Sequence, residues 1–459
     1  MTGSATATAT AEARVLEAIA RAMRAASPFA ALSVAYSGGI DSSVLLEALC
    51  RLQAKLALPP PRALHVDHGL EADSARWRAH CAEQCARRGI VFRSMRVDAR
   101  ARAGESPEAA AREARYRALA GALAAGEALC VAHHQDDQAV TVLLNLLRGS
   151  GVDGLAGMGA ERALAPGRLL RPLLAVCRRD IEACAAAWDL RWVQDPSNAR
   201  PRHPRNRLRE QVLPLLEAIT PGAAAVIARS ARLHGEAAVT LDALARADLL
   251  ACSSDAPDLL CCAALARLPP QRRCAALRVW LRDAGVRPPG EACLREAARQ
   301  LVAAGPDRAP RIVWSDGELR VGAGRVAFLR GAAVPRPAAE AAWDWQPGTV
   351  LELPAGRLSA RPRVGAGLAA AGPLQVRLRR GGERCRPAGR AHSQTLKRLL
   401  QERQVPAWER AELPLLYRDG VLVAVADLWV CHGHAAGAGA PGWQLCWEPT
   451  RGRAGRGAA

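Results

Sequence analysis

Residues 31–195 alternate short apolar runs with longer amphipathic ones, and this alternation limits the fold more than any other feature of the 459-residue chain. The short runs predict strands at Leu32–Tyr36, Ala63–Val66, Ile90–Val97, Ala128–Ala132 and Arg191–Val193. The longer runs predict helices at Ser43–Gln53, Ala72–Arg88, Pro107–Ala125, Asp136–Arg148 and Arg178–Trp188. Such an alternation predicts an α/β domain, a parallel sheet with helices on both faces. Ligands of these sheets bind at the carboxyl ends of the strands.

The pattern changes after Pro214. Residues 215–305 have helical spacing with a break at Pro269-Pro270, and the alternation around Asp316-Gly317 predicts a hairpin. Near Val350 a small α+β unit begins, with predicted strands and one helix at Gln375–Leu378, Val421–Ala426, Gln444–Trp447 and Ser393–Arg403. We therefore expect a disordered tip and leading helix (1–30), the parallel-sheet domain (31–214), a mainly helical domain (215–331), a linker (332–349), the α+β domain (350–449) and a basic tail (450–459).

The chain carries a net charge of +19, and only Lys55 and Lys397 among its 63 basic residues are lysines. This excess charge favours a polyanionic partner such as a nucleic acid. No run approaches the roughly 20 apolar residues of a membrane span. The N-terminus lacks a secretory signal, so a cytoplasmic location without membrane contact is the default expectation.

The fourteen cysteines are scattered and contain no C-x-x-C pair. The nearest approaches are Cys81/Cys85 and Cys261/Cys262. In a cytosolic chain this spacing is typical of small apolar core residues and predicts neither a disulfide framework nor a zinc site.

A turn of unusual composition joins the first predicted strand to its helix: Ser37, Gly38, Gly39, Ile40, Asp41 and Ser42. The glycines let an anion approach the backbone, and the helix N-terminus adds its positive dipole end. The hydroxyls can donate to phosphate oxygens. The Asp41 carboxylate would repel an anion, so its presence here is explained if it holds a magnesium ion that the phosphates share. The turn predicts a pyrophosphate–magnesium pocket; the alternative is a tight turn with a Ser or Asp cap. The kinase-type P-loop motif is absent.

Polar residues also follow two other predicted strands. His65 lies in "LHVDHGL", and His133 ends the strand that leads into Asp136 and Asp137. The acidic pair could simply cap its helix, and a zinc site would lack a third ligand of diagnostic spacing. The functional interpretation is that Asp137 faces the same edge of the sheet as Asp41.

Arginines gather in three places. Arg112 and Arg115 are three residues apart and lie on one face of a predicted helix. That face could belong to the site, or it could be an ordinary solvated helix face with paired charges. A second group, Arg202, Arg205, Arg207 and Arg209, forms a strip that favours binding of a polyphosphate chain. The third group, in the distal domain, includes Arg379, Arg380, Lys397 and Arg398.

The turn S-G-G-x-D-S resembles the loop of the ATP-pyrophosphatase (PP-loop) superfamily. In combination and order, the motifs of residues 31 to about 430 resemble the tRNA(Ile)-lysidine synthetase family. They are "SGGIDS", "HVDHGL", "EAAAREARY", "HHQDDQ", "RGSGVDGL", "RPLL", "DPSN" and "RNRLR". The C-terminal stretch from Arg377 to Val430 also resembles the distal domain of this family.

The resemblance implies an ATP-dependent ligase with Mg²⁺, free L-lysine and the CAU-anticodon tRNA(Ile) as partners. ATP would adenylate oxygen 2 of the wobble cytidine, and the lysine ε-amine would displace AMP to give lysidine, which changes the tRNA from methionine to isoleucine identity. Residues 31–214 would be the ATP-binding catalytic domain, and the two later domains would bind tRNA. The ATP site would combine the turn with His65 and His133, and Asp41 would hold magnesium. Arg112 and Arg205 would hold the base, and Asp137 would accept the proton of the attacking amine.

One position departs from the family pattern. The family usually has glutamate where this chain has Val140, and no role of that glutamate can be transferred to valine. The remaining alternatives are a tRNA cytidine 2-thiolation enzyme, a GMP-synthetase-type amidotransferase and a catalytically degenerate tRNA-binding protein. The sequence does not indicate the oligomeric state.

Overall fold

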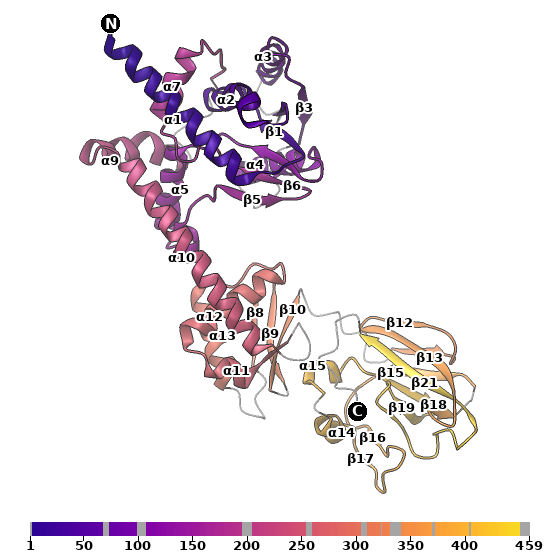
Figure 1. Cartoon of the computed structure of the whole chain (residues 1–459). Coiled ribbons are helices and arrows are strands. Elements are labelled where there is room, and N and C mark those ends of the chain that lie inside the picture. The colour runs from indigo at the N-terminus through magenta and orange to yellow at the C-terminus, as the bar shows by residue number, and fades with distance from the viewer. Residues whose placement is uncertain are drawn as a thin grey trace. The chain divides into compact units, whose positions relative to one another are not determined.

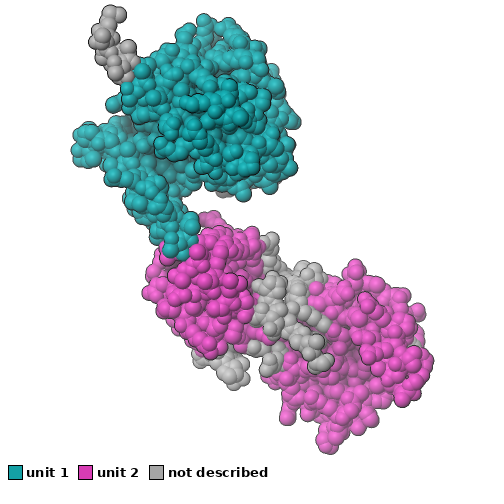
Figure 2. Space-filling view, viewed as in Figure 1, with its two compact units in different colours: residues 1–240 teal, residues 241–459 magenta. Residues whose placement is uncertain are grey.

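The computed structural model describes residues 2–67, 73–98, 107–194, 204–253, 259–303, 310–322, 324–330, 341–369, 372–403 and 405–449. The chain divides into two compact units, Met1–Thr240 and Leu241–Ala459 (Figure 2). Among the described residues no single helix has the length and hydropathy of a membrane span. The segments Pro204–Ile219 and Ala223–Cys252 meet that test only as a pair, across a bend of 98°.

The first unit is built on a sheet with the strand order β3-β2-β1-β4-β6-β5. Figure 1 labels β1, β3, β5 and β6 of this sheet. The strands of the sheet are β1 (Ala31–Ala35), β2 (Pro61–Asp67), β3 (Phe92–Arg96), β4 (Glu127–Cys130), β5 (Glu161–Leu164) and β6 (Gly167–Leu170). All neighbours are parallel except β5 and β6, which form a hairpin. The predicted parallel-sheet α/β fold is therefore confirmed. Since β2 and β4 flank β1, the strand order reverses there, and such a switch point is where open α/β sheets bind ligands.

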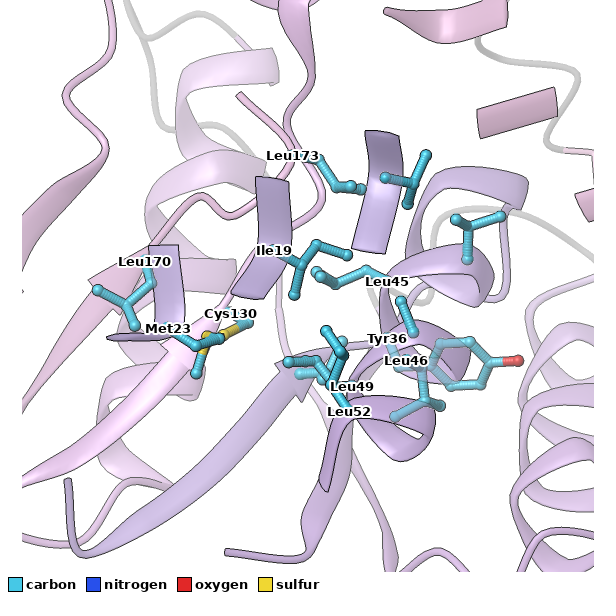
Figure 3. Packing of buried hydrophobic residues seen from close by; sticks show 14 of the residues in the cluster. Ile19, Met23, Tyr36, Leu45, Leu46, Leu49, Leu52, Cys130, Leu170 and Leu173 are labelled. Atoms are coloured by element: carbon cyan, nitrogen blue, oxygen red, sulfur yellow. The ribbon is translucent and has the colours of Figure 1, made fainter. Parts of the chain in front are cut away.

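The helices of this unit cover both faces of the sheet. They are α1 (Thr2–Ala26), α2 (Ile40–Leu56), α3 (Ser74–Ala86), α4 (Pro107–Gly121), α5 (Gln135–Leu147), α6 (Val152–Leu155), α7 (Arg178–Ala187), α8 (Pro204–Arg207), the π-helical turn η2 (Leu208–Val212), α9 (Leu213–Ile219) and α10 (Ala223–Cys252), the last of which continues into the second unit. On one face α1, α2 and α7 share a core in which Ile19 lies beside Leu45 and Leu49 (Figure 3). On the other face Leu119 of α4 and Leu123, two residues after the end of that helix, pack in a cluster with Leu64, Leu129 and Leu169 of the sheet.

Three elements differ from the sequence-based expectation. Helix α1 begins at Thr2, so the predicted disordered tip is helical, as its many alanines allow. The predicted strand Arg191–Val193 does not join the sheet; the Val193 N–H donates to the Gly38 carbonyl oxygen (2.9 Å) instead. The sheet is completed by the β5–β6 hairpin, which the sequence analysis did not predict.

The second unit opens with the expected helical part. It contains β7 (Leu259–Cys261), α11 (Cys262–Arg267), α12 (Pro270–Asp283), α13 (Glu291–Ala303), β8 (Arg311–Trp314), β9 (Gly317–Gly322) and β10 (Arg325–Arg330). The break at Pro269-Pro270 and the β8–β9 hairpin around Asp316-Gly317 are confirmed. The buried Arg273 donates to carbonyl oxygens of Leu265 and Ala298, which ties the ends of this helical layer together.

The distal part of the unit contains two antiparallel sheets, β11-β15-β18-β19-β20 and β12-β13-β21-β14, and a short β16-β17 ladder. Its elements are β11 (Ala342–Trp345), β12 (Leu351–Leu353), β13 (Gly356–Val364), β14 (Leu368–Ala369), β15 (Leu374–Leu378), β16 (Arg384–Cys385), β17 (Gln394–Thr395), α14 (Leu396–Glu402), α15 (Ala407–Arg410), β18 (Pro414–Arg418), β19 (Val421–Val425), β20 (Trp429–Val430) and β21 (Pro441–Pro449). The three predicted strands and the predicted helix appear here. Strand β11 pairs with β15, so this fold begins before the predicted linker ends.

Candidate active site

The turn between β1 and α2 is shaped by contacts from two other segments. Gly38 has φ +84°, a left-handed conformation that glycine adopts without strain. A Cβ atom at this position would lie 2.6 Å from Cys81 Sγ, so space as well as conformation requires glycine. Because Val193 is hydrogen-bonded to Gly38, the sequence segment predicted as a strand instead fixes the turn.

Hydroxyl groups close the turn from inside. Ser37 Oγ lies 3.1 Å from Ser42 Oγ, and the Gly39 N–H donates to Ser37 Oγ (3.3 Å). Ser42 Oγ donates to the Gly39 carbonyl oxygen (3.0 Å). Helix α2 starts at Ile40, and the N–H groups of a first helical turn have no intrahelical acceptor, so they can receive an anion.

Asp41 lies in this first turn, and one oxygen of its carboxylate has no hydrogen-bond partner. Its Oδ1 atom is buried and has no hydrogen-bond partner, although 30% of the side chain is exposed. Burial raises the pKa of Asp41 above its ordinary value. An orphaned carboxylate oxygen beside a phosphate loop fits a hard cation such as Mg²⁺, which proteins commonly hold through one carboxylate and the substrate's phosphates. In the described part of the chain no three His, Cys, Asp or Glu side chains converge as a metal site built from protein ligands alone would require.

His134 connects the end of β4 to the turn after β1. Its buried ring places Nε2 3.9 Å from Asp41 Oδ1 and 3.4 Å from Asp137 Oδ2, while Nδ1 lies 3.6 Å from Asp136 Oδ1. Burial alone would lower the pKa of His134, but Asp136, Asp137 and Asp41 outweigh it and raise that pKa above the ordinary value. The three carboxylates around the ring thus favour the protonated form of His134.

Asp137 is the centre of a second set of contacts. Arg205 donates to its Oδ1 at 3.3 Å and to Thr141 Oγ1 at 3.4 Å, and Arg209 also donates to Asp137 Oδ1. Burial would raise the pKa of Asp137, but the charges of His134 and Arg209 hold it below its ordinary value. Arg205 and Asp137, predicted as site residues from separate motifs, thus lie in direct contact.

Val140 does not face these polar groups. Its side chain has 0% exposure and belongs to an apolar cluster with Leu208, Leu213 and Ala224, which joins α5 to η2, α9 and α10. At this position the chain has a packing contact in place of a carboxylate.

Two histidines named from the sequence lie at strand ends next to the site. The buried His65 donates from Nδ1 to the Tyr36 carbonyl oxygen (2.9 Å), and burial lowers its pKa. The half-buried His133 has an unpartnered Nδ1, and burial lowers its pKa to about 3. Both rings are neutral at neutral pH, so they offer hydrogen bonds and flat surfaces but no charge.

Arg112 makes a different contact from the one its sequence motif suggested. Its guanidinium lies 5.0 Å from the centroid of the Tyr116 ring and forms no ion pair in the described part of the chain. Arg207 is exposed on α8, and Arg202 lies outside the described residues.

The sequence analysis did not name His134 or Arg178 as site residues. The backbone N–H of Arg178 donates to Asp136 Oδ1 (3.1 Å). His134 was visible in its motif, whereas Arg178 had no sequence signal.

The distal basic residues lie in unit 2 and are described separately. Arg379 pairs with Glu383 (3.5 Å) and Arg398 with Glu402 (3.2 Å), while Arg380 and Lys397 are exposed. Exposed side chains of this kind can meet a nucleic-acid backbone without rearrangement of the core.

The fold and the phosphate turn together define a nucleotide-binding α/β protein of the PP-loop class. The PP-loop domain family matches residues 8–216, the TilS substrate binding domain family residues 260–327, and the TilS substrate C-terminal domain family residues 374–447. A tRNA(Ile)-lysidine synthase of Alkalilimnicola ehrlichii is 42% identical over 94% of this chain and 96% of its own length. Another, from Pseudomonas aeruginosa, is 44% identical over 91% and 93%. The chain belongs to the tRNA(Ile)-lysidine synthase family.

A solved structure with detectable likeness is the U34-tRNA thiolase NcsA from Methanococcus maripaludis with its [4Fe-4S] cluster. It is 19% identical, covers 48% of this chain and 79% of its own, and has a TM-score of 0.41.

Proposed function

We propose that this protein ligates L-lysine to carbon 2 of the wobble cytidine of tRNA(Ile) with the anticodon CAU. ATP first adenylates oxygen 2 of that cytidine with release of pyrophosphate, and the ε-amine of lysine then attacks carbon 2 and releases AMP. The modified anticodon pairs with AUA, so the tRNA changes from methionine to isoleucine identity. We place the reaction in the cytoplasm. Family membership supports the class of reaction, and the site geometry supports the residue roles.

The observation that carries the proposal is the contact of His134 with both Asp41 and Asp137. It joins the phosphate turn after β1 to the acidic and basic cluster after β4, at the switch point of the sheet. ATP phosphates on the turn would thus lie beside the groups that can hold a substrate base. Adenylation needs these two sets of groups at one place, because the nucleotide oxygen must reach the α-phosphate.

Asp137 is better suited to positioning than to proton transfer. A carboxylate whose pKa is lowered by cations is a weak proton acceptor at neutral pH. We assign it the task of holding Arg205 and Arg209, whose charges can stabilise the adenylated intermediate. Arg112, whose charge acts on His133, remains the second candidate for contact with the wobble nucleotide.

The turn residues Ser37–Ser42 would hold the β- and γ-phosphates. Magnesium, where bound with ATP, would be held by Asp41, and it would neutralise charge on the departing pyrophosphate. His65 and His133 would line the nucleotide site as neutral rings. In the distal domain Arg379, Arg380, Lys397 and Arg398 would contact tRNA phosphates.

The test is mass spectrometry of the wobble nucleoside after the full-length protein has been incubated with ATP, lysine and an unmodified CAU transcript. We expect a cytidine that has gained lysine minus one water. Omission of lysine should leave the cytidine without this mass gain, and a transcript with another wobble base should gain nothing. A product that gains sulfur in a complete reaction with a sulfur donor, or no modified nucleoside at all, would overturn the proposal.

A further inference from the structure

The ring of Tyr116 is surrounded by guanidinium groups. The Cζ atoms of Arg112, Arg115 and Arg162 lie 5.0, 5.4 and 4.8 Å from the ring centroid. Arg112 and Arg115 come from α4, as does Tyr116, whereas Arg162 comes from β5 of the hairpin that the sequence analysis missed. A single cation over an aromatic face is a favourable contact, but three place like charges close together.

Arg171 adds a fourth cation, close to Tyr116, Arg162 and Arg112. It is 6% exposed, and one of its terminal nitrogens donates to the Gly159 carbonyl oxygen (2.5 Å). Its Nε atom is buried without a hydrogen-bond partner. Burial lowers the pKa of Arg171; Tyr116 opposes this shift, and the nearby charges of Arg162 and Arg112 add to it.

Among the side chains that the structure describes, which do not include that of Glu108, none of the four arginines forms an ion pair with a carboxylate. Other arginines of the same elements are paired: Arg117 on α4 contacts Glu113 (2.5 Å), and Arg168 on β6 contacts Glu161 (3.3 Å). A buried charge without a counter-charge is costly, and mutual repulsion adds to that cost. The arrangement is therefore suited to an anion that comes from outside the protein.

The cluster adjoins the proposed reaction site. The backbone N–H of Val131 donates to the Leu170 carbonyl oxygen (2.9 Å). The segments that follow β4 and β6, which carry His133 and Arg171, therefore run side by side. The pKa of His133, lowered mainly by burial, is lowered further by the charges of Arg171, Arg112 and Arg115. The cluster also opens to solvent, because Arg112 and Arg162 are exposed while Arg115 is half-buried.

We infer that Arg112, Arg115, Arg162 and Arg171, gathered around Tyr116, bind successive phosphodiester groups of the RNA substrate next to the reacting nucleotide. This inference deepens the proposed function and rests on it for the identity of the RNA. A carboxylate of free lysine would neutralise only one of four charges. The pyrophosphate of ATP belongs to the turn after β1, and β6 lies two strands away in the sheet, about 10 Å at ordinary strand spacing. A nucleic-acid backbone supplies several phosphates and reaches the cluster from solvent.

Arg162 is the residue that tests the inference. It is exposed on a hairpin strand, so Arg162→Gln should leave the fold intact, which thermal unfolding can verify. The matched control is Arg117→Gln, which removes the same charge from the outer surface of α4. Unmodified tRNA is titrated into each full-length protein over a salt series, ATP is titrated in parallel, and the KM for lysine is measured.

For Arg162→Gln we expect the Kd for tRNA to rise about tenfold. The slope of log affinity against log salt should fall by about 0.7, the value for one contact with single-stranded RNA. Arg162→Lys should restore the slope but only part of the affinity, because lysine keeps the charge and loses the fork. The affinity for ATP and the KM for lysine should not change, and Arg117→Gln should behave as wild type.

An unchanged tRNA slope in Arg162→Gln would overturn the inference. A raised KM for lysine with unchanged tRNA binding would assign the cluster to the lysine carboxylate, and a weakened affinity for ATP would assign it to pyrophosphate. Because the titrations require no turnover, wild-type protein that binds tRNA through this cluster yet forms no lysidine would refute the proposed function alone.

Discussion

At the scale of one residue, Val140 is the position where the chain departs from the pattern expected from the family resemblance. Its side chain is enclosed by Leu208, Leu213 and Ala224, so a carboxylate placed there would be buried among apolar groups. The acidic function near the turn is already supplied by Asp41, Asp136 and Asp137. We therefore expect the wild-type chain to be active with valine at this position.

The corresponding prediction is that Val140→Glu destabilises the protein and does not raise its activity. An uncompensated buried charge should lower the free energy of unfolding by roughly 3 kcal/mol. Denaturant unfolding measures this change, with Leu147→Glu on the exposed end of the same helix as a control that should be nearly neutral. A Val140→Glu protein as stable as wild type and more active would show that the glutamate has a partner here.

Asp41→Asn tests the role of the orphaned carboxylate. The variant keeps the shape of the side chain but loses its charge, so AMP formation should fall by at least about a hundredfold if Asp41 holds the cation that the phosphates share. The Kd for tRNA should stay close to wild type and thermal stability should fall only slightly, since the variant loses the 3.9 Å charge contact between Asp41 Oδ1 and His134 Nε2 but no hydrogen bond. Turnover at the wild-type rate with saturating magnesium would remove Asp41 from the mechanism.

The cluster around His134 predicts a pH dependence of stability. The pKa of His134 is raised in the folded protein above the ordinary value of 6.5. Its contribution to stability is therefore complete below that value and is lost as the pH rises through the raised pKa. Denaturant unfolding of wild type and His134→Gln, from about pH 6 to about pH 9, should show a difference in unfolding free energy that shrinks with rising pH. A difference that stays constant would mean that the imidazole does not change its protonation in this range.

At the scale of elements, α1 contributes a large part of the core of the first unit. Ile19 is fully buried between α2 and α7, beside Leu45 (Figure 3). We expect Ile19→Ala to lower the free energy of unfolding by about 2 to 5 kcal/mol, the usual cost of a large cavity. Arg21→Ala on the exposed side of the same helix should change it by less than about 0.5 kcal/mol. Equal effects of the two substitutions in chemical denaturation would mean that α1 is not part of the cooperative core.

The regular elements were predictable where a local pattern defines them. Buried strands β1, β2 and β4 are apolar runs, and α2 and α5 have a clear apolar face. The segment Arg191–Val193 also looks like a strand, but its backbone bonds to the phosphate turn at Gly38, a contact with a distant part of the chain. The β5–β6 hairpin escaped because its strands are short and β5 is largely exposed, so neither shows the apolar run of an inner strand.

At the scale of the whole molecule, the distal domain is expected to add tRNA affinity without affecting ATP. The truncated chain should end after residue 331. A chain that ended at residue 346 would keep β11 but lose β15, the strand with which β11 pairs. We expect removal of the domain to weaken tRNA binding and to flatten its salt dependence by several units, at roughly 0.7 to 0.9 per phosphate contact. Titrations of tRNA over a salt series and of ATP measure both effects. Equal losses of ATP and tRNA affinity would show that the truncation damages the catalytic domain instead.

The parallel-sheet class, the phosphate turn and the family were predictable from the sequence alone, because each depends on residues close together along the chain. Ser37–Ser42 carries its own turn chemistry, and the spacing of apolar residues sets the helices and strands. Only the tertiary structure decided that His134 joins Asp41 to Asp137, that Val140 is a core residue, and that Arg162 meets Tyr116. These contacts depend on strand order and on which side chains point to the same edge of the sheet. A local sequence pattern does not specify either one, because both result from packing between segments distant in the chain.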